Sequence, residues 1–316
     1  MVTKNMLLQQ VDRVEITVLV DNVTDMLIQG SPHAKRAPFF KGTEMLPPLR
    51  AEHGFSALIA IYLNNNSHRL LFDTGASGDV LLFNADRLEV DLSDVETIVL
   101  SHGHHDHVGG LIPILKRMGR AHMPVVLHSD AFLNRWLILQ NGQRIRLRPV
   151  EEDKVLEAGA QVVKTTEPYT LFGNLVIATS EIPRKTQFEQ GFPGHYAEIE
   201  GKLQPDPLLR DDQALVMNVK GKGLVVISGC AHAGIINTVL YAKKLTGVDG
   251  LYALIGGFHL SFPNEQIIGP TVEELKEIRP TFIIPCHDTG WKATNAILNA
   301  MPENFIPSAV GTTFIF

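Results

Sequence analysis

Cysteine is scarce in this sequence: Cys230 and Cys286 are the only two among 316 residues. Two cysteines cannot supply the disulfide framework of a small secreted protein, and so low a count is typical of a reducing cytosol. Residues 1–10 lack the long apolar core of a signal peptide. The longest clean apolar run, residues 57–63, is far shorter than the roughly 20 residues that span a bilayer. We therefore expect a cytoplasmic protein without a membrane partner.

Basic residues are also in the minority, with 28 lysines and arginines against 34 aspartates and glutamates and a formal net charge of −6. This balance gives no general attraction for nucleic acid or for an anionic membrane surface. Hydrophobic residues make up 45% and charged residues 20% of the chain, which excludes a mostly disordered protein. We expect a globular protein without a nucleic-acid partner, and the composition leaves homo-oligomer formation open.

The first quarter of the chain has the periodicity of strands. Apolar residues alternate with others at 14–20, which predicts a half-buried strand. Residues 24–50 contain glycine and several prolines, and they predict a long irregular segment. Residues 55–63 and 69–72 are typical of two strands of a hairpin, joined by a polar turn at 64–67.

Two later segments share one pattern. A short strand at 97–100 leads into a histidine-rich loop and then into a helix with apolar spacing at 111–118. A strand at 224–227 leads into a second loop with histidine and glycine, and then into a helix at 235–245. The pattern favours an internal duplication, although so short a match can arise by coincidence. We predict a single domain over residues 1–316, with duplicated halves at about 12–150 and 160–316.

The last quarter repeats the alternation of strands and helices. Strands are predicted at 251–255 and 281–284, and Thr271 is a candidate cap for a helix that runs through Lys276. Strands dominate each half, and helices follow them. This order favours an α/β protein in which two sheets pack face to face with helices outside.

The strongest chemical signal is a cluster of four histidines, His102, His104, His105 and His107. His102 and His104 are two residues apart in a loop, so both imidazoles can reach one cation. Asp106 and His107 follow at the start of a helix and can reach a second cation. Such ligands suit zinc, with manganese and iron as alternatives, and two such ions can hold a hydroxide and polarise a substrate oxygen. A solvated histidine-rich loop is the structural alternative, which the carboxylate and two glycines beside the histidines disfavour.

The pattern His-x-His-x-Asp-His at 102–107 resembles the signature of the metallo-β-lactamase superfamily. The resemblance implies a four-layered αββα sandwich of two mixed sheets flanked by helices, with two divalent metal ions held at this loop. It also implies that Asp73, at the end of a predicted strand, supports the metal loop without binding metal. A turn-forming aspartate before glycine is the other reading of Asp73, and both can hold at once.

Further segments resemble one branch of that superfamily, the dihydropterin-aminobenzene-ribofuranosyl-phosphate synthase-like group. Archaeal members are associated with a pterin-transfer step, and many bacterial relatives are called metal-dependent hydrolases. Asp288 departs from the group, in which cysteine is expected at this place, and this weakens any transfer of the activity. The segments that carry the resemblance are 21–22, 53–56, 182–184, 211–215, 228–234, 256–260 and 285–290.

The resemblance implies further metal ligands near later strand ends. His287 resembles the last metal-binding histidine of the superfamily, with a turn histidine bonded to the backbone as the alternative. Cys230 and His232 both lie where the bridging acidic ligand is usual. We favour His232, because a thiolate bridge is unusual among nitrogen and oxygen ligands and because cysteine is often a small buried apolar residue.

The middle histidine of the superfamily precedes a strand that corresponds to residues 214–219. Asp212 stands there instead, either as a ligand, as a residue that orients a ligand, or as a cap. His195, within a Pro-Gly-His segment, lies far from that strand in the sequence, and we do not expect it at the site.

Two more residues are candidates for substrate contact. His259 follows a strand and two glycines, so it can contact substrate, complete a metal site or be a core histidine. Arg184, beside Lys185 in a proline-containing loop, can bind a phosphate or carboxylate, or can be solvated. Because ligands of α/β proteins bind where strands end, we expect these side chains to converge in one crevice.

These residues predict a metal-dependent hydrolase in which a metal-bound hydroxide, oriented by Asp106, attacks an ester, lactone or phosphoester of a small molecule. One alternative is a synthase that joins a dihydropterin pyrophosphate to an aminobenzene ribofuranosyl phosphate, with a phosphorylated or pterin-like substrate. Another is a metal-containing ligand-binding protein without turnover.

Overall fold

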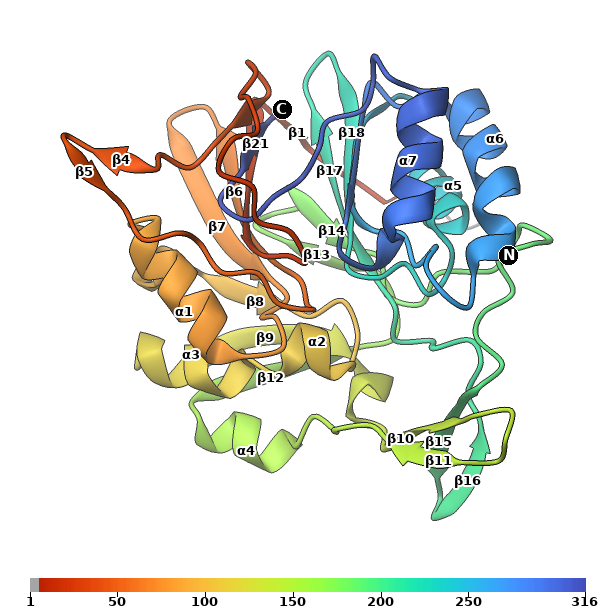
Figure 1. Cartoon of the computed structure of the whole chain (residues 1–316). Coiled ribbons are helices and arrows are strands. Elements are labelled where there is room, and N and C mark those ends of the chain that lie inside the picture. The colour runs from red at the N-terminus through yellow and green to blue at the C-terminus, as the bar shows by residue number, and fades with distance from the viewer. Residues whose placement is uncertain (1–5) are drawn as a thin grey trace.

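The computed structural model describes residues 6–316, so residues 1–5 of the N-terminal segment discussed above lie outside the described residues. Two large mixed sheets pack face to face, and helices cover their outer faces (Figure 1). The predicted fold class, a four-layered α/β sandwich, is confirmed. No helix among residues 6–316 combines the length and the apolar character that crossing a membrane would require.

The first large sheet is built mainly from the N-terminal half. Its first four strands run parallel, and the remaining pairs are antiparallel. In spatial order the strands are β12 (Ala160–Thr165), β9 (Met123–His128), β8 (Thr97–Val99), β7 (Asn66–Phe72), β6 (Ser56–Leu63), β2 (Arg13–Val20), β21 (Thr313–Ile315) and β3 (Ala34–Lys35).

The second large sheet is built mainly from the C-terminal half. Its spatial order is β13 (Tyr169–Leu171), β14 (Val176–Ala178), β17 (Ala214–Val219), β18 (Gly223–Ser228), β19 (Leu251–Gly257) and β20 (Phe282–Cys286), with β1 (Gln10–Val11) beside β17. The last three strands are parallel. The first and last strands of the chain each join the sheet of the opposite half. Strand β1 joins this second sheet, and β21 joins the first.

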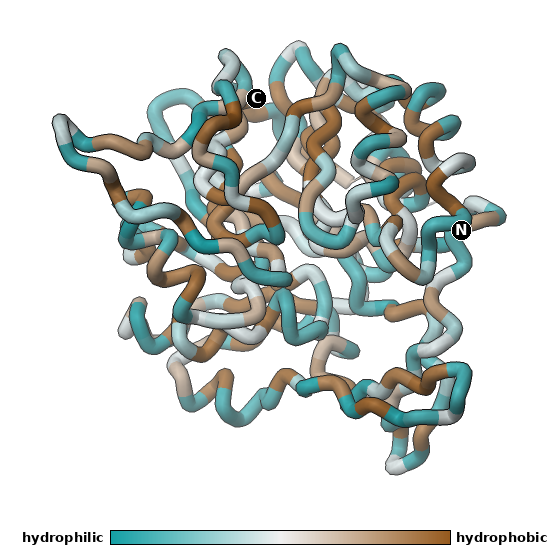
Figure 2. The backbone as a smooth tube through the Cα atoms, viewed as in Figure 1, coloured by the Kyte–Doolittle hydropathy of each residue, from teal (hydrophilic) through white to brown (hydrophobic). Residues whose placement is uncertain are grey.

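Six of the helices in the described part of the chain lie in two groups of three. Those on the first sheet are α1 (Gly78–Arg87), α3 (Leu111–Met118) and α4 (Glu152–Glu157). Those on the second sheet are α5 (Ile235–Thr246), α6 (Ile268–Ile278) and α7 (Trp291–Ala300). A third apolar layer, which includes Ile59, Phe72 and Ile227, fills the space between the sheets. Figure 2 shows hydrophobic segments along the strands inside the molecule and hydrophilic ones at its outer loops.

Local sequence signals explain most of these elements. The alternating Val14, Ile16 and Val18 are buried in β2 as predicted. Helix α3 turns Leu111, Ile114 and Leu115 inward and ends at a glycine with left-handed φ. The hairpin turn is shorter than predicted, because β7 begins at residue 66 and only two asparagines connect it to β6.

The predicted cap of α6 is wrong. This helix begins at Ile268, after a short 3-10 turn, and Thr271 is buried within it. Pro270 explains the earlier start, because a proline in the first turn of a helix lacks only an N–H that has no helical partner there. Residues 24–50 are largely irregular, as predicted, apart from β3 and the short pair β4 (Phe40–Lys41) and β5 (Glu44–Met45).

A small third sheet, which the sequence did not predict, projects from one end of the sandwich (Figure 1). Its antiparallel strands are β11 (Arg144–Arg146), β10 (Arg135–Ile138), β15 (His195–Ile199) and β16 (Lys202–Pro205). Arg135 attaches it to the sandwich. This buried guanidinium donates to Asp211 at 2.7 and 3.0 Å and to Asp206 at 2.8 Å.

Candidate metal centre

The loops after five strands of the two large sheets meet at one edge of the sandwich. They follow β7, β8, β18, β19 and β20, and they carry most of the residues that the sequence singled out. The loop after β8 continues into a one-turn helix, α2 (His105–Val108). The structure brings together all six predicted metal ligands in two neighbouring clusters, His102, His104, Asp106, His107, His232 and His287.

The first cluster, here called the three-histidine cluster, consists of His102, His104 and His232. Nε2 of His232 lies 3.2 Å from Nε2 of His102 and 3.1 Å from Nδ1 of His104. Tetrahedral ligands at a Zn–N distance of about 2.05 Å would lie roughly 3.3 Å apart. Burial lowers the pKa of His104 to about 4 and those of His102 and His232 well below the usual range. The imidazoles are therefore neutral near pH 7, and this donor set fits a divalent cation.

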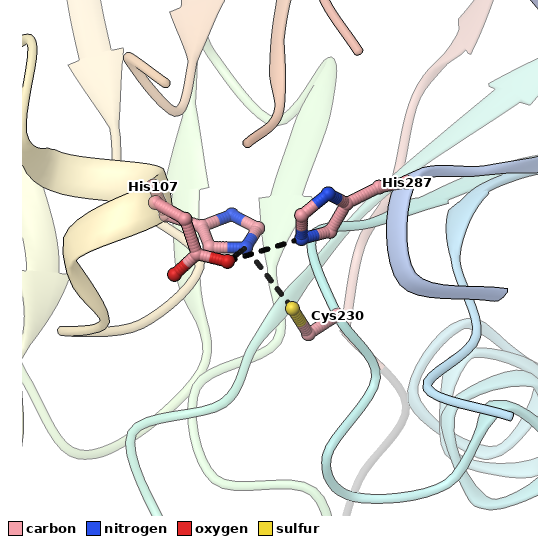
Figure 3. Close-up of side chains that lie close together, drawn as sticks. His107, Cys230 and His287 are labelled. Atoms are coloured by element: carbon pink, nitrogen blue, oxygen red, sulfur yellow. Dashed lines mark hydrogen bonds and ion pairs between the residues drawn. The ribbon is translucent and has the colours of Figure 1, made fainter. Parts of the chain in front are cut away.

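The second cluster, here called the mixed cluster, consists of Asp106, His107, Cys230 and His287. Figure 3 shows His107, Cys230 and His287 pointing toward one another from separate segments. Cys230 Sγ lies 3.0 Å from His107 Nε2, and Asp106 Oδ2 lies 3.2 Å from His287 Nε2. Nε2 of His287 is buried and faces Asp106 Oδ2, so it points into the cluster as a ligand nitrogen would.

The charges of the mixed cluster also fit a cation. Burial raises the pKa of Asp106, but His107 and His287 outweigh it and hold this carboxyl well below its usual range. Burial lowers the pKa of His107, but Asp73 and Asp106 raise it to about 9. Burial also raises the pKa of the Cys230 thiol. Because ligands must be deprotonated, cation binding here would release protons.

The sequence offered Cys230 and His232 as alternatives for one ligand position, and we favoured His232. The structure places one in each cluster, with Cys230 beside His107 and His232 beside His102. The signal that could have revealed this is their spacing. Like His102 and His104, they are two residues apart in a loop that follows a strand.

Asp73 lies beneath the clusters and joins neither. Its buried carboxylate accepts from Ser101 N at 2.6 Å, from Ser101 Oγ at 2.7 Å and from His107 Nδ1 at 2.7 Å. A Cβ at Gly229 would overlap Ser101 Oγ, so only glycine allows the two loops to approach here. Asp73 is therefore placed to fix the ring of His107 and the loop that carries His102.

Two adjacent aspartates hold the loops of the three-histidine cluster. Asp211 Oδ2 accepts from Gly103 N, between two ligand histidines, at 2.8 Å. Asp212 Oδ2 accepts from Ala233 N, beside His232, at 2.8 Å. Burial raises the pKa of Asp212 to about 7. Of the roles that the sequence left open for Asp212, this geometry favours orienting a ligand.

Asp212→Ala is expected to weaken cation binding at the three-histidine cluster by about 10- to 100-fold, because the Ala233 N–H loses its partner and His232 loses its orientation. Asp212→Asn keeps an acceptor oxygen at the same place, so its affinity for the cation should fall far less. Competition with a chromophoric chelator measures both affinities. Equal losses in the two variants would contradict this role.

His259 lies at the wall of the site. Its Nδ1 bonds to the carboxylate of Asp288, and its backbone N–H donates to Asp288 Oδ1 at 3.1 Å. Its ring centroid is 4.3 Å from that of His232. Asp288, where cysteine was expected, thus fixes His259 and leaves Nε2 as the ring atom available to a ligand.

Arg184 does not take the predicted position. Its guanidinium donates to Ile182 O at 2.6 Å and also to Leu208 O, and it does not line either cavity next to the clusters. The loop after β14 turns this side chain against backbone carbonyls, so the anion contact of Arg184 stays a prediction without support from this geometry. Lys185 does not line these cavities either.

Two cavities adjoin the clusters. The larger has a volume of about 550 Å³ and reaches both clusters, and the smaller has a volume of about 270 Å³. His232, His259 and Pro263 line both, so the two cavities meet at the three-histidine cluster. The volumes are in the range of small-molecule sites.

His195 is the residue that sequence reasoning missed. It is buried, it stacks on His104 with ring centroids 5.1 Å apart, and it lines the larger cavity. It comes from β15 of the small sheet. His195 was set aside because it is far along the chain from β17, but the small sheet brings it back to the site. Predicting that sheet was the only way to predict this position.

The sequence is similar to known proteins over most of its length. The family model described as the metallo-beta-lactamase superfamily matches residues 51–243. The chain is 31% identical over 261 residues to a 7,8-dihydropterin-6-methyl-4-(beta-D-ribofuranosyl)-aminobenzene-5'-phosphate synthase of Methanocaldococcus jannaschii, which covers 82% of this chain and 88% of the relative. It is 33% identical to an uncharacterized protein of the same organism, over 83% of this chain and 92% of that protein.

Solved structures agree on the fold. A metal-dependent hydrolase of the beta-lactamase superfamily, Tm1679, superposes with a TM-score of 0.73 at 24% identity and covers 95% of this chain and 98% of its own. The metallo-beta-lactamase fold protein YhfI from Bacillus subtilis has a TM-score of 0.50 at 13% identity, with 96% and 100% covered. At these identities the likeness concerns the fold alone.

Proposed function

The chain belongs to the metallo-β-lactamase superfamily and is an enzyme, and on this premise we propose that it is a metal-dependent hydrolase of an ester, lactone or phosphoester in a small molecule. The observation that carries the proposal is the pair of buried clusters side by side beneath one cavity. Two separate donor sets of this kind suit a dinuclear centre.

The three-histidine cluster would hold one divalent cation, and the mixed cluster would hold the second. Zinc suits the combination of imidazole and thiolate better than manganese or iron, which prefer harder ligands. Such ions supply Lewis-acid chemistry when bound, polarising a substrate oxygen and acidifying water. We further propose one domain, because β1 and β21 are exchanged between the sheets.

The protein's own residues would orient the reactants. Asp106 lines the cavity with a carboxylate whose pKa is held low, so it can accept a hydrogen bond from the attacking water. His259 presents Nε2 to the cavity while Asp288 holds Nδ1, so it can hold or deliver a proton at the leaving group. Asp73 and Asp212 keep the ligand loops in place.

A synthase reaction is the second candidate. It is favoured by 31% identity, over most of the chain, to a relative named as a pterin-related phosphate synthase. The two cavities that meet at His232 and His259 would suit two reactants, a dihydropterin pyrophosphate and an arylamine acceptor. Asp288 departs from the cysteine expected in that group, so hydrolysis remains our first proposal.

One assay separates the two. Metal-replete protein is given a dihydropterin pyrophosphate with and without an aminobenzoate-type acceptor, alongside a panel of esters, lactones and phosphoesters. Hydrolysis of panel members, with water consuming the pterin substrate, is the expected result. Formation of the carbon–nitrogen product, with no panel member hydrolysed, would replace the hydrolase by the synthase.

A further inference from the structure

We propose that Arg148, oriented by His105, binds an anionic group of the substrate at the mouth of the larger cavity. The substrate class is then a small molecule with an apolar body and one carboxylate or phosphoryl group remote from the reacting bond. This inference rests on the proposed function, because it concerns the cavity above the same two clusters.

Charge inside the larger cavity points to Arg148. Among the described residues that line it, Arg148 is the one lysine or arginine. The carboxylates of the lining are already engaged, because Asp106 faces His287 and Asp288 bonds to His259. A guanidinium is positive at any physiological pH, so the cavity offers a permanent cation to an anionic ligand.

His105 holds this side chain. Its Nε2 lies 3.1 Å from Arg148 Nη1, and because a guanidinium nitrogen can only donate, Nε2 is the acceptor. His105 is the one member of the histidine tetrad that joins neither metal cluster. The bond occupies one of five N–H donors, and the others can bind a carboxylate or a phosphoryl group in the bidentate geometry that arginine favours.

The backbone beneath Arg148 is also fixed. Leu147 N donates to Arg135 O at 2.9 Å, and the guanidinium of Arg135 is bound to Asp211. Asp211 in turn accepts from Gly103 N, between two ligand histidines. The backbone next to Arg148 is therefore tied to the three-histidine cluster, and the bond to His105 restricts the exposed guanidinium before a ligand arrives.

The side chains that line the cavity indicate what the rest of the substrate is like. Leu137 of β10, Leu147 just after β11, and Phe192 and Phe262 from neighbouring loops line it. Phe262 is 87% exposed, so its ring is accessible to a ligand in the cavity. An apolar or flat body can rest on these side chains while its anion reaches Arg148 and its reacting group faces the clusters.

The test is calorimetric binding of benzoate, phenylphosphonate and neutral benzyl alcohol to the metal-loaded protein. Arg148→Gln is expected to weaken at least one anion about 10- to 100-fold, the range of a charge-assisted hydrogen bond, and to leave benzyl alcohol unchanged. Arg146→Gln is the matched control, since this exposed arginine of the same hairpin does not line the cavity. Its affinities should stay within about twofold of the parent.

The probes also distinguish the anion. If Arg148→Gln binds only phenylphosphonate more weakly, the site takes a phosphoryl group. If it binds only benzoate more weakly, the site takes a carboxylate, and weaker binding of both identifies a general anion site. Unchanged anion affinity in Arg148→Gln, an equal loss in Arg146→Gln, or no anion binding by the parent protein would overturn the proposal. Binding is measured without turnover, so failure of the hydrolase assignment would leave this result intact.

Discussion

Replacing His102 and His104 together by alanine is expected to remove one of two bound cations and to lower kcat/KM by more than about 10³-fold. His102 and His104 supply two of the three ligands of their cluster, and a catalytic centre of this kind takes about three protein ligands. Elemental analysis after dialysis counts cations per chain, and hydrolysis of the best panel substrate measures kcat/KM. Circular dichroism checks that the variant is folded.

Further variants test the two clusters independently. Asp106→Asn with His287→Ala should also leave one cation per chain, and all four substitutions together should leave none. His122→Asn is the control for loss of a histidine, since this exposed side chain joins neither cluster and asparagine tolerates its φ of 60°. Two cations retained in the His102 and His104 variant would refute the assignment of the three-histidine cluster.

The sequence predicted the elements whose signals are local. Buried strands such as β18 and the helices that follow, such as α5, are readable from apolar periodicity within a dozen residues. The histidine signature is equally local, because His102 and His104 need only a loop at a strand end to face one cation. The fold class followed from these elements and from the resemblance, and the structure confirms it.

The parts that the sequence could not predict depend on contacts between distant segments. The small sheet pairs β10 with β15, some 60 residues apart, and its strands are short and mostly half-buried or exposed, so their sequences carry little apolar periodicity. His195 was consequently set aside. Arg184 was assigned by residue type, but whether a guanidinium faces a cavity or a carbonyl is decided by the chain around it.

Replacing the buried Arg135 is expected to lower the stability of the fold substantially. Its guanidinium, 2% exposed, pairs with Asp211, which is fully buried, and with Asp206. Arg135→Met would leave the Asp211 carboxylate in the interior without its cation, at a cost of about 3–5 kcal/mol in the free energy of unfolding. Urea unfolding in the presence of a chelator measures this without a contribution from bound metal. Arg117→Met, which breaks the exposed pair with Asp86, should cost under about 1 kcal/mol.

The pH dependence of that loss identifies its cause. Burial raises the pKa of Asp211, but Arg135 outweighs burial and holds it below the usual value. In the parent protein, Asp211 therefore stabilises the fold above its unfolded pKa, and this contribution is lost as pH falls. Without Arg135 the largest cause that opposes burial is gone, although the Gly103 N–H still bonds to the carboxylate, so we expect the pKa to rise. The ionised group then opposes folding at high pH, and protonation relieves this at low pH. The deficit of Arg135→Met should accordingly be greater at pH 8 than at pH 5, whereas a deficit equal at both would point to lost packing of the arginine side chain.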